Sequence, residues 1–340
     1  MTCASHVLAL IGRPVGNGAA HMAHRQKRRA CFAALWFVLG MALATAAVAL
    51  QPGRGIAIIY PDIGEPYRSV FSKIIEGIED QAKSHVPSFA VGTDANVHDI
   101  ADELRRQDIH IVIALGRNGM KAAAGLERDI HIVTGGVISI PEAKANNIEV
   151  FSLAPDPALL FARLQDFMPA AKRVFVVYDP RQNAWLMRLA RDAAASRNLV
   201  LIAYEAQDLK TAVRLYQEIL ATADAKKDAL WLLQDSTTVD EGVVLPLVLQ
   251  EAWSHNLMLF SSNAAHVRRG ALFSLYPNNL EIGRSLANSA LGYTVSAGQH
   301  APRGINPLKA VSIAVNLRTA SHLGLNIEDK QSFDLVFPEP

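Results

Sequence analysis

The chain has 340 residues, of which half are hydrophobic and 19% are charged, a composition that excludes an intrinsically disordered protein. Its 33 Lys and Arg residues nearly balance 32 Asp and Glu residues, and no basic patch beyond residue 50 indicates nucleic-acid binding. A chain of this length allows one large domain or two ordinary ones.

The N-terminal segment differs from the rest of the chain. A basic cluster at 25–29 precedes the uncharged run 30–50, which contains the small-residue pattern Ala47-Val48-Ala49. This order is typical of a secretory signal peptide, so we expect residues 1–49 to be cleaved and the mature protein to be periplasmic. Met22 is a candidate start of translation. The alternative is an uncleaved membrane anchor, because an apolar run of 21 residues can span a bilayer.

Cleavage would change the charge and the cysteine content of the protein. Five basic residues and no acidic residue precede residue 50, so the mature chain would carry a net charge of −4. Cys3 and Cys31, the only two cysteines, also lie in this segment. The mature protein would therefore have no disulfide, no thiolate nucleophile and no zinc site built on cysteine.

From residue 55 onward, short β-branched segments alternate with stretches of helical periodicity. The strands predicted in the first half are 56–60, 88–91, 110–115, 130–134 and 148–151. The helices predicted there are one beginning at Pro66, one at 95–107 and one at 118–126.

The alternation breaks near 150–156 and restarts at Asp156-Pro157, which is typical of a helix N-terminus. The strands predicted in the second half are 173–178, 199–204, 229–233, 257–260, 271–275 and 311–317. The helices predicted there are one from 157, 184–196, one capped by Asp208, 243–253, 278–293 and 319–323. At the start of 278–293, Asn278 is the predicted N-cap and Glu281 its capping-box partner.

Continuous apolar strands between amphipathic helices are typical of parallel sheets that are covered on both faces. Because the alternation occurs twice, we predict an α/β protein with two doubly wound parallel-sheet lobes and a ligand cleft between them. Lobe 1 is predicted to comprise 55–150 plus about 277–305, and lobe 2 to comprise 151–276 plus about 306–335. The sequence does not determine which of the two lobes carries the last segment, 306–340.

Ligands of open parallel sheets bind beyond the carboxyl ends of the strands. Small hydroxyl, amide and glycine residues follow the predicted strands at these ends, and such groups bind small polar ligands, while helix N-termini favour an anionic end. The candidate ligand-binding residues are Ile63, Gly64, Glu65, Gly116, Arg117, Asn118, Gly135, Gly136, Tyr178, Asp179, Asp235, Ser236, Thr237, Ser262, Asn263 and Tyr276.

Three of these side chains allow two interpretations. Arg117 can face the cleft and pair with a carboxylate or phosphate, or it can be a solvated or ion-paired surface arginine. Tyr178 and Tyr276 can stack on a ligand or belong to the edge of the core. Of all the candidates, Tyr276 is our first choice for a side chain that contacts the ligand.

The sequence offers little support for catalysis. It contains no nucleophile elbow, no H-E-x-x-H motif and no P-loop, and the segment Gly116-Arg117-Asn118-Gly119 is not G-x-G-x-x-G. Acidic residues at predicted strand–helix junctions (Asp62, Glu65, Asp179 and Asp235) are interpreted as helix caps rather than a catalytic pair. No histidines pair at metal-ligand spacing. We predict no enzyme activity, no catalytic residue, no metal and no cofactor.

Four segments, taken together, carry a family resemblance: Lys172–Pro180, Trp231–Thr238, Gly270–Arg284 and Val315–Gly324. They resemble the ABC-transporter substrate-binding family that includes tryptophan- and other aromatic-amino-acid-binding members, in an order and spacing that extend over about residues 55–325. The resemblance implies a type I periplasmic-binding-protein fold, whose two lobes close on a small-molecule ligand around a hinge. It also implies delivery to a membrane permease driven by a cytoplasmic ATPase, and we expect a monomer.

The chain departs from the family pattern at two predicted ligand-binding turns. Gly116-Arg117-Asn118 stands where members usually carry Gly-Thr-Pro-like residues, and Leu275–Asn278 stands where they tend to carry a Gly-Val-Asp-Tyr-like turn. The third turn of the pattern corresponds here to Asp235-Ser236-Thr237. Because both departures fall at the ligand site, the resemblance does not specify an aromatic amino acid, and an arginine in the cleft suits a more anionic ligand.

These observations predict a periplasmic solute-binding protein that captures a small polar ligand, amino-acid-like or an anionic metabolite, for ABC-type import. The alternative is a ligand-sensing periplasmic subunit that signals to a membrane receptor or kinase without transport.

Overall fold

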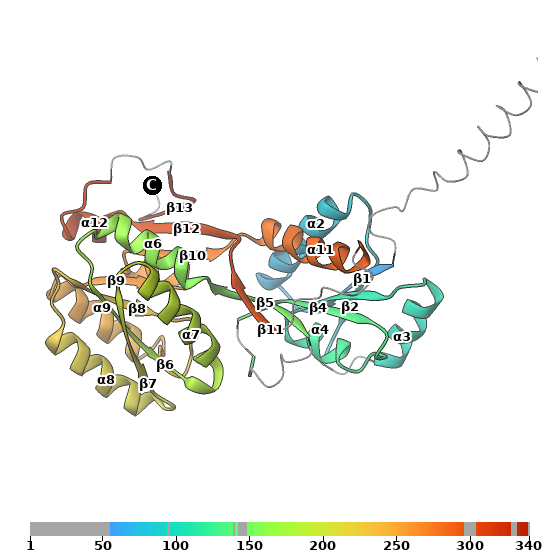
Figure 1. Ribbon diagram of the computed structural model, residues 1–340, viewed down its shortest axis with the longest axis horizontal. Helices are drawn as coiled ribbons and strands as arrows, with labels where there is room; N and C mark the ends of the chain where they lie inside the picture. Colours follow the sequence, from blue (N-terminus) through green and yellow to red (C-terminus); the bar gives the residue numbers. More distant parts are fainter. Residues whose placement is uncertain are drawn as a thin grey trace, which may run out of the picture. The chain divides into compact units, whose positions relative to one another are not determined.

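The computed structural model describes residues 55–93, 96–138, 140–141, 148–295, 304–327 and 332–338. The predicted signal peptide, Met22 and both cysteines lie outside the described residues. Within the described ranges, no helix combines the length and the apolar character needed to cross a membrane. The strands form two sheets, and each sheet has helices on both faces (Figure 1).

The first sheet consists of six parallel strands. They are β1 (Ile56–Pro61), β2 (Ser88–Val91), β3 (Ile111–Leu115), β4 (His131–Val137), β5 (Glu149–Pro155) and β11 (Gly304–Leu308). Their order across the sheet is β11-β5-β4-β3-β1-β2, and every neighbouring pair is parallel. We refer to this sheet and its helices as lobe 1.

Alternate side chains of these strands pack against different helices. Ile58 and Ile113 face α2 (Tyr67–Ala82) and α11 (Asn279–Val295). Ala57 and Ile59 face α3 (Val97–Arg106) and α4 (Gly116–Ala123) on the other side of the sheet. The strands are apolar on both faces because both faces are covered, as the sequence predicted.

Helices α2 and α11 touch backbone to backbone. A Cβ atom on Gly77 would overlap the carbonyl group of Leu280, and a Cβ atom on Gly283 would overlap that of Ile74. Beside this contact, Arg284 Nε donates to Asp80 Oδ2 at 2.8 Å. The Gly283-Arg284 pair that contributes to the family resemblance therefore fastens α11 to lobe 1.

The cap of α11 follows the prediction in part. Asn278 Oδ1 accepts a hydrogen bond from the backbone N–H of Glu281 at 3.2 Å, which confirms Asn278 as the N-cap. The reciprocal bond of a capping box is absent, because the N–H of Asn278 donates to Ala310 O at 3.0 Å and the Glu281 carboxylate pairs with Arg284. A tertiary hydrogen bond of Asn278 and an ion pair within α11 thus take the place of the reciprocal capping-box bond.

The second sheet has seven strands. They are β6 (Arg173–Tyr178), β7 (Val200–Glu205), β8 (Asp228–Leu232), β9 (Met258–Ser261), β10 (Phe273–Pro277), β12 (Val311–Asn316) and β13 (Leu335–Phe337). Their order is β13-β12-β10-β9-β8-β6-β7. We refer to this sheet and its helices as lobe 2. It includes β13 and a short helix, α10 (Ala264–Arg269), that the sequence did not predict.

One strand pair departs from the predicted parallel arrangement, because β10 and β12 are antiparallel. The chain enters β12 directly from β11, which ends at the carboxyl edge of the first sheet. It therefore enters the second sheet at the edge where the parallel strands end, and β12 runs opposite to them.

Two layers of helices cover the second sheet. One face packs on α6 (Pro157–Phe167), α7 (Pro180–Ser196) and α12 (Leu317–His322), with the buried aromatic residues Phe161, Trp231 and Phe260 at the contact. The other face packs on α8 (Leu209–Thr222), α9 (Val244–Ser254) and α10. Successive side chains of β6 and β8 pack alternately against one helix layer and the other.

The chain passes between the two sheets at three places, after β5, after β10 and after β11. These crossing segments are hydrogen-bonded to one another: Asp156 N–H donates to Leu308 O at 2.9 Å, and Asn278 N–H donates to Ala310 O at 3.0 Å. The predicted lobe limits at 150 and 305 fall inside β5 and β11, so lobe 1 extends to Pro155 and Leu308.

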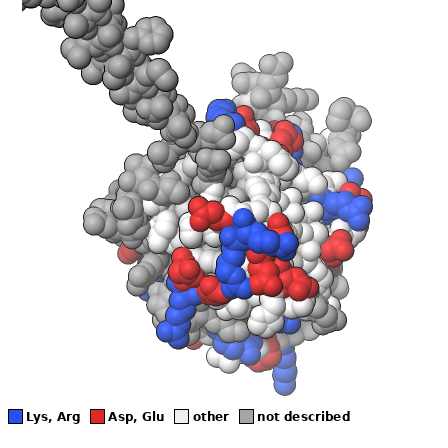
Figure 2. Space-filling view, turned by 90° about the vertical axis from the view of Figure 1, so that its right-hand side faces the viewer, with Lys and Arg blue, Asp and Glu red and all other residues white. Residues whose placement is uncertain are grey.

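The end of lobe 1 that carries α3 displays charges of both signs (Figure 2). Arg105 pairs with Asp102 and with Glu127, and Arg106 pairs with Glu103 at 2.6 Å. Charges that alternate in sign cancel at short range, so this face offers no surface of a single sign to a polyanion.

Candidate functional site

A cavity of about 400 Å³ is lined by residues from both lobes, and we refer to it as the interlobe cavity. Lobe 1 contributes Arg117, in the first turn of α4, and Ile138, which follows β4. Lobe 2 contributes Gln182, Leu233, Gln234, Asp235, Ser236, Val239, Asp240, Glu241, Asn263 and His266. The loops after β3, β4, β8 and β9 supply most of this lining, so the cavity lies at the carboxyl edges of both sheets.

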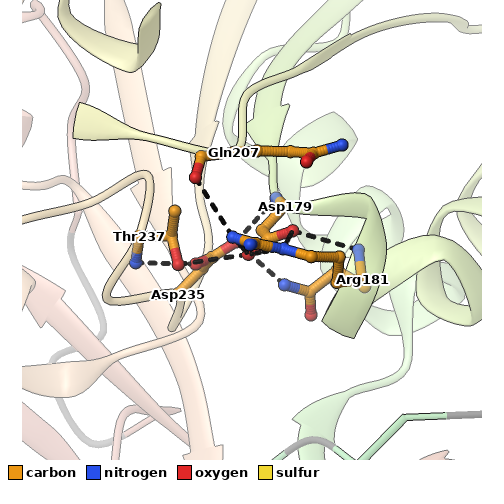
Figure 3. A network of polar contacts seen from close by, with 6 residues as sticks. Asp179, Arg181, Gln207, Asp235 and Thr237 are labelled. Carbon is orange, nitrogen blue, oxygen red and sulfur yellow. Dashed lines mark hydrogen bonds and ion pairs between the residues drawn. The ribbon is translucent and has the colours of Figure 1, made fainter. Parts of the chain in front are cut away.

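Asp235 anchors the lobe 2 wall of the interlobe cavity (Figure 3). The residue is 6% exposed, and its carboxylate accepts three hydrogen bonds of 2.9 Å. The donors are the backbone N–H groups of Asp179 and Thr237 and the side-chain amide of Asn183. These bonds tie the loop after β8 to the start of α7, so the carboxylate shapes the wall of the cavity.

Asp179 is held in the same network, directly behind this wall. It is fully buried, and its Oδ1 accepts from the backbone N–H of Arg181 at 3.0 Å, which confirms its predicted role as a helix cap. The Arg181 guanidinium, whose Nη2 lies 2.6 Å from Oδ2, holds the pKa of Asp179 below its usual range. Thr237 Oγ1 donates to the same oxygen at 3.2 Å, and Arg181 Nη2 also donates to Gln207 O at 3.1 Å.

His266 lines the interlobe cavity, although the sequence did not predict it as a site residue. It is 3% exposed, and its Nδ1 lies 2.8 Å from Ser261 Oγ. Burial, assisted by the nearby charge of Arg269, lowers the pKa of His266 to about 4. A neutral imidazole therefore borders the cavity at neutral pH. Helix α10 is too short for a helical periodicity to be recognised in the sequence. The N-cap residue Asn263, whose Oδ1 accepts from Ala265 N–H at 3.0 Å, was the only sequence feature that could have indicated a helix here.

Arg117 is the one cation in the lining of the interlobe cavity. Its side chain is exposed, and no hydrogen-bond or ion-pair partner occurs for it among the residues that the structure describes. The structure thus offers no ion-pair partner for Arg117 among the described residues, and contact of its guanidinium with a ligand stays a prediction beside the alternative of a solvated surface arginine.

The neighbouring glycines of lobe 1 have a packing role. Gly116 and Gly136 have φ values of +67° and +70°, and a Cβ atom on Gly136 would lie 3.3 Å from the backbone nitrogen of Gly116. A Cβ atom on Gly135 would lie 2.7 Å from the side chain of Leu286 in α11. The turns after β3 and β4 therefore press against each other and against α11, which leaves no room for side chains.

The tyrosines that were candidates for stacking lie elsewhere. Tyr178 is buried in the core of lobe 2, and its hydroxyl donates to Glu205 Oε1 at 2.8 Å. Tyr276 is half-buried within β10, and burial raises its pKa. Ser262, another candidate, is buried and accepts a hydrogen bond from Trp231 Nε1 at 2.9 Å. In the described part of the chain, no aromatic ring other than that of His266 lines the interlobe cavity.

The candidate residues after β1 also lie outside this cavity. Glu65 Oε2 accepts hydrogen bonds from the backbone and the hydroxyl of Ser69, at 3.3 and 2.6 Å, and so supports the first turn of α2. The structure thus places four predicted residues in the lining: Arg117, Asp235, Ser236 and Asn263. It does not bring the remaining ones to the cavity, namely Ile63, Gly64, Glu65, Gly116, Asn118, Gly135, Gly136, Tyr178, Asp179, Thr237, Ser262 and Tyr276. Ligand contact by any of these residues stays a prediction.

The lining of the interlobe cavity offers groups that can hydrogen-bond a ligand. Asp179 and Asp235 are close in the fold, but both carboxylates are engaged with backbone and side-chain donors. Among the described residues, no group of three or more His, Cys, Asp or Glu side chains could hold a metal ion. The lining combines one guanidinium, carboxylates, amides and a hydroxyl, which can hydrogen-bond a small polar molecule.

Comparison with known families identifies the chain. The family model described as ABC transporter substrate binding protein matches residues 75–333. The chain belongs to this family. A comparison with curated proteins gave no match.

Solved structures agree with the family at the level of the fold. A protein from Streptococcus pneumonia in complex with L-Trp is 14% identical, with 84% of this chain and 100% of that chain covered and a TM-score of 0.51. A ligand-free, open substrate-binding protein with adhesive properties from Clostridium difficile is 14% identical, with the same coverage and a TM-score of 0.56. The two mostly parallel sheets with interleaved helices match those neighbours, which confirms the predicted type I periplasmic-binding-protein fold. The family and these neighbours are binding proteins.

Proposed function

We propose that this substrate-binding protein captures a small polar ligand, amino-acid-like or an anionic metabolite, in the interlobe cavity and delivers it to the membrane permease of an ABC importer. The observation that carries the proposal is the division of charge across the cavity. Lobe 1 supplies the guanidinium of Arg117, whereas lobe 2 supplies the acidic residues Asp235, Asp240 and Glu241.

Arg117 suits the anionic end of such a ligand. A guanidinium donates two parallel N–H bonds to a carboxylate or phosphate, and these charge-assisted bonds are stronger than neutral ones. The exposed position of Arg117 leaves this edge accessible.

The acidic wall suits an ammonium or hydroxyl group of the same ligand. Asp235 accepts three hydrogen bonds from the protein, and Asp240 Oδ1 accepts from the N–H groups of Gly242 and Val243 at 2.9 and 2.7 Å. Glu241 is exposed and adds a further negative charge to this wall. A ligand that contacts Arg117 and this wall at once would stabilise the arrangement in which both lobes contact it.

The remaining parts of the proposal come from the sequence. The order of basic, apolar and small residues in 1–49 supports export to the periplasm. Family membership supports an ABC permease as the partner. That the protein acts as a monomer is part of the proposal.

A thermal-shift screen tests the proposal. The purified protein is screened against amino acids, small peptides and anionic metabolites, and a bound ligand raises the melting temperature by mass action. Titration calorimetry then measures the affinity of the stabilising ligand for the wild type and for Arg117→Gln. We expect this variant to bind about tenfold more weakly, because it loses a charge-assisted pair.

The matched control is Arg128→Gln, since Arg128 is also an exposed arginine of lobe 1 but does not line the cavity. Without ligand, both variants should melt like the wild type, because exposed side chains contribute little to stability. A screen without any stabilising compound, or equal affinity of the Arg117 variant and the wild type, would contradict the proposal. Uptake of the identified ligand by cells with and without the protein then tests delivery.

A further inference from the structure

Lobe 2 contains a second cavity, of about 590 Å³, which we refer to as the distal cavity. It is lined by Trp253 at the end of α9, by Arg268, Arg269 and Gly270 at the end of α10, and by Arg318 in α12. Helix α9 ends shortly before β9 begins, and α10 ends shortly before β10 begins. The distal cavity therefore lies at the amino-terminal edge of these strands, opposite the edge that borders the interlobe cavity.

The lining of the distal cavity is strongly cationic. It includes three arginines and no aspartate or glutamate among its twelve residues. Arg269 Nη1 donates to the backbone oxygen of Glu241 at 3.1 Å, which fixes this arginine in place. The positive charges of Arg269 and Arg318 around one hollow create a positive potential that an entering anion would relieve.

Aromatic rings hold two of these guanidinium groups in the wall. The guanidinium carbon of Arg318 lies 5.7 Å from the ring centre of Trp253, and that of Arg268 lies 5.9 Å from the ring centre of Phe337. The Trp253 ring is in turn stacked on His322, with ring centres 3.7 Å apart. Because the Arg318 guanidinium lies over the Trp253 ring, it keeps N–H groups along its edge for a planar anion.

The floor of the distal cavity is rigid. Asn316 is 7% exposed; its Nδ2 donates to Val267 O at 2.8 Å, and its Oδ1 accepts from Thr319 N–H at 3.0 Å. Thr319 Oγ1 donates to Gly270 O at 2.9 Å. These bonds tie the ends of α10 and β12 together, so the arginines project from a preformed frame, as in small-molecule sites.

We propose that the distal cavity binds a second small ligand, one that carries two negative charges as carboxylate or phosphate groups on an aromatic or other flat apolar body. Its volume lies within the range of roughly 300–1,000 Å³ that is typical of small-molecule sites. A hollow of this size favours a small molecule over a flat protein surface. The site is separate from the interlobe cavity, so it does not depend on the function proposed above.

The two cavities share a structural element. Helix α10 and its cap contribute Asn263 and His266 to the interlobe cavity, and Arg268 and Arg269 to the distal cavity. Arg269 also holds the carbonyl of Glu241, another residue of the interlobe lining. Residues that line the distal cavity are therefore close in the chain to residues that line the interlobe cavity.

Titration of the full chain with phenyl phosphate tests the proposal, with tryptophan fluorescence and calorimetry as readouts. Trp253 lines the cavity and is 37% exposed, whereas Trp185 and Trp231 are buried and Trp36 belongs to the predicted signal peptide, so the fluorescence change should come from Trp253. Phthalate in a parallel titration distinguishes a dicarboxylate from a phosphate ligand. Inorganic phosphate, which lacks the ring, should bind more weakly than phenyl phosphate.

Arg318→Gln should weaken binding of the better probe about tenfold, through the loss of one charge-assisted pair. Arg269→Gln serves as a second variant, and circular dichroism verifies the folding of both. Arg214→Gln is the matched control, because Arg214 lies on α8 of the same lobe, paired with Glu218 at 2.5 Å. Trp253→Phe should abolish the fluorescence change while calorimetry still detects binding.

Absence of saturable binding of both phenyl phosphate and phthalate up to about 10 mM would overturn the proposal, since affinities weaker than this correspond to less than about 3 kcal/mol. Equal affinity in the wild type and both arginine variants would also overturn it. So would binding of an acidic peptide without binding of either small anion, which would indicate a protein partner. Arg117→Gln should leave probe binding unchanged, so a failure here is distinct from a failure at the interlobe cavity.

Discussion

The two lobes border the interlobe cavity with different kinds of surface. Lobe 2 contributes ten lining residues, whose loops are positioned by buried polar side chains such as Asp235, Asp179 and His266. Lobe 1 contributes two, Arg117 and Ile138, and its turns are built from glycines that pack closely. A wall held by buried hydrogen bonds is preorganised, and substitutions in it lower the stability strongly. An exposed arginine beside a glycine turn can be substituted with little loss of stability.

The largest expected effect is at the centre of the lobe 2 wall. Asp235→Ala leaves three donors without their acceptor, two of them on the buried residues Asp179 and Asn183, so we expect a loss of about 4 kcal/mol in the free energy of unfolding. Urea denaturation measures it. Asp240→Ala is the control, because Asp240 also lines the cavity but caps an exposed turn, and we expect about 1 kcal/mol. If both variants lost the same free energy of unfolding, burial of the Asp235 network would not account for its contribution to stability.

A somewhat smaller effect should appear as a pH dependence. The pKa of His266 is lowered to about 4 in the folded protein, so the unfolded chain takes up a proton below about pH 6.5 while the folded protein does not. Stability should therefore fall as the pH decreases from 6.5 towards 4, with about 3 kcal/mol attributable to this residue, and should be insensitive to it above pH 7.

Urea denaturation of the wild type and of His266→Gln at pH 7 and pH 4.5 measures this contribution. The variant should lose less stability between the two pH values than the wild type does. His110→Gln, at an exposed histidine of lobe 1, should keep the wild-type dependence. Parallel pH profiles for wild type and His266→Gln would disprove the role of this imidazole.

The smallest effect belongs to the lobe 1 turns. Gly136→Ala forces an alanine to φ +70° and places its Cβ 3.2 Å from the ring of Phe71, so we expect a loss of about 2 kcal/mol. Gly64→Ala is the control, because a Cβ atom there meets nothing within 4 Å. Thermal denaturation compares the two. If both alanine variants were as stable as the wild type, the glycines of lobe 1 would have no packing role.

Local features of the fold were predictable because short-range contacts determine them. Asp156, Asp179, Asp208 and Asn278 were predicted to begin helices, and each accepts a hydrogen bond from a backbone N–H two or three residues further on. The central strands were predictable for another reason: both faces of the sheet are covered, so a strand such as β3, with the sequence IVIAL, is buried and apolar throughout.

The site was less predictable, because its geometry depends on contacts between distant parts of the chain. Tyr276 was predicted to lie in a turn, whereas the pairing of β10 with β12 places it within the sheet. His266 reaches the interlobe cavity through a helix of six residues, too short for a periodic signal. The interlobe cavity lies at the carboxyl ends of strands in both sheets, but the sequence does not show in which direction each side chain at those ends points.

The amino-acid sequence alone determined the two-lobe α/β architecture, the helix caps and the family, since all three depend on patterns of neighbouring residues. The tertiary structure decided which side chains line the cavities, why Gly283 must lack a side chain and why β12 reverses direction. Asp235 and Asp179 are 56 residues apart in the chain and meet only when β6 and β8 pair. Such contacts arise from the packing of whole elements, and no local pattern encodes them.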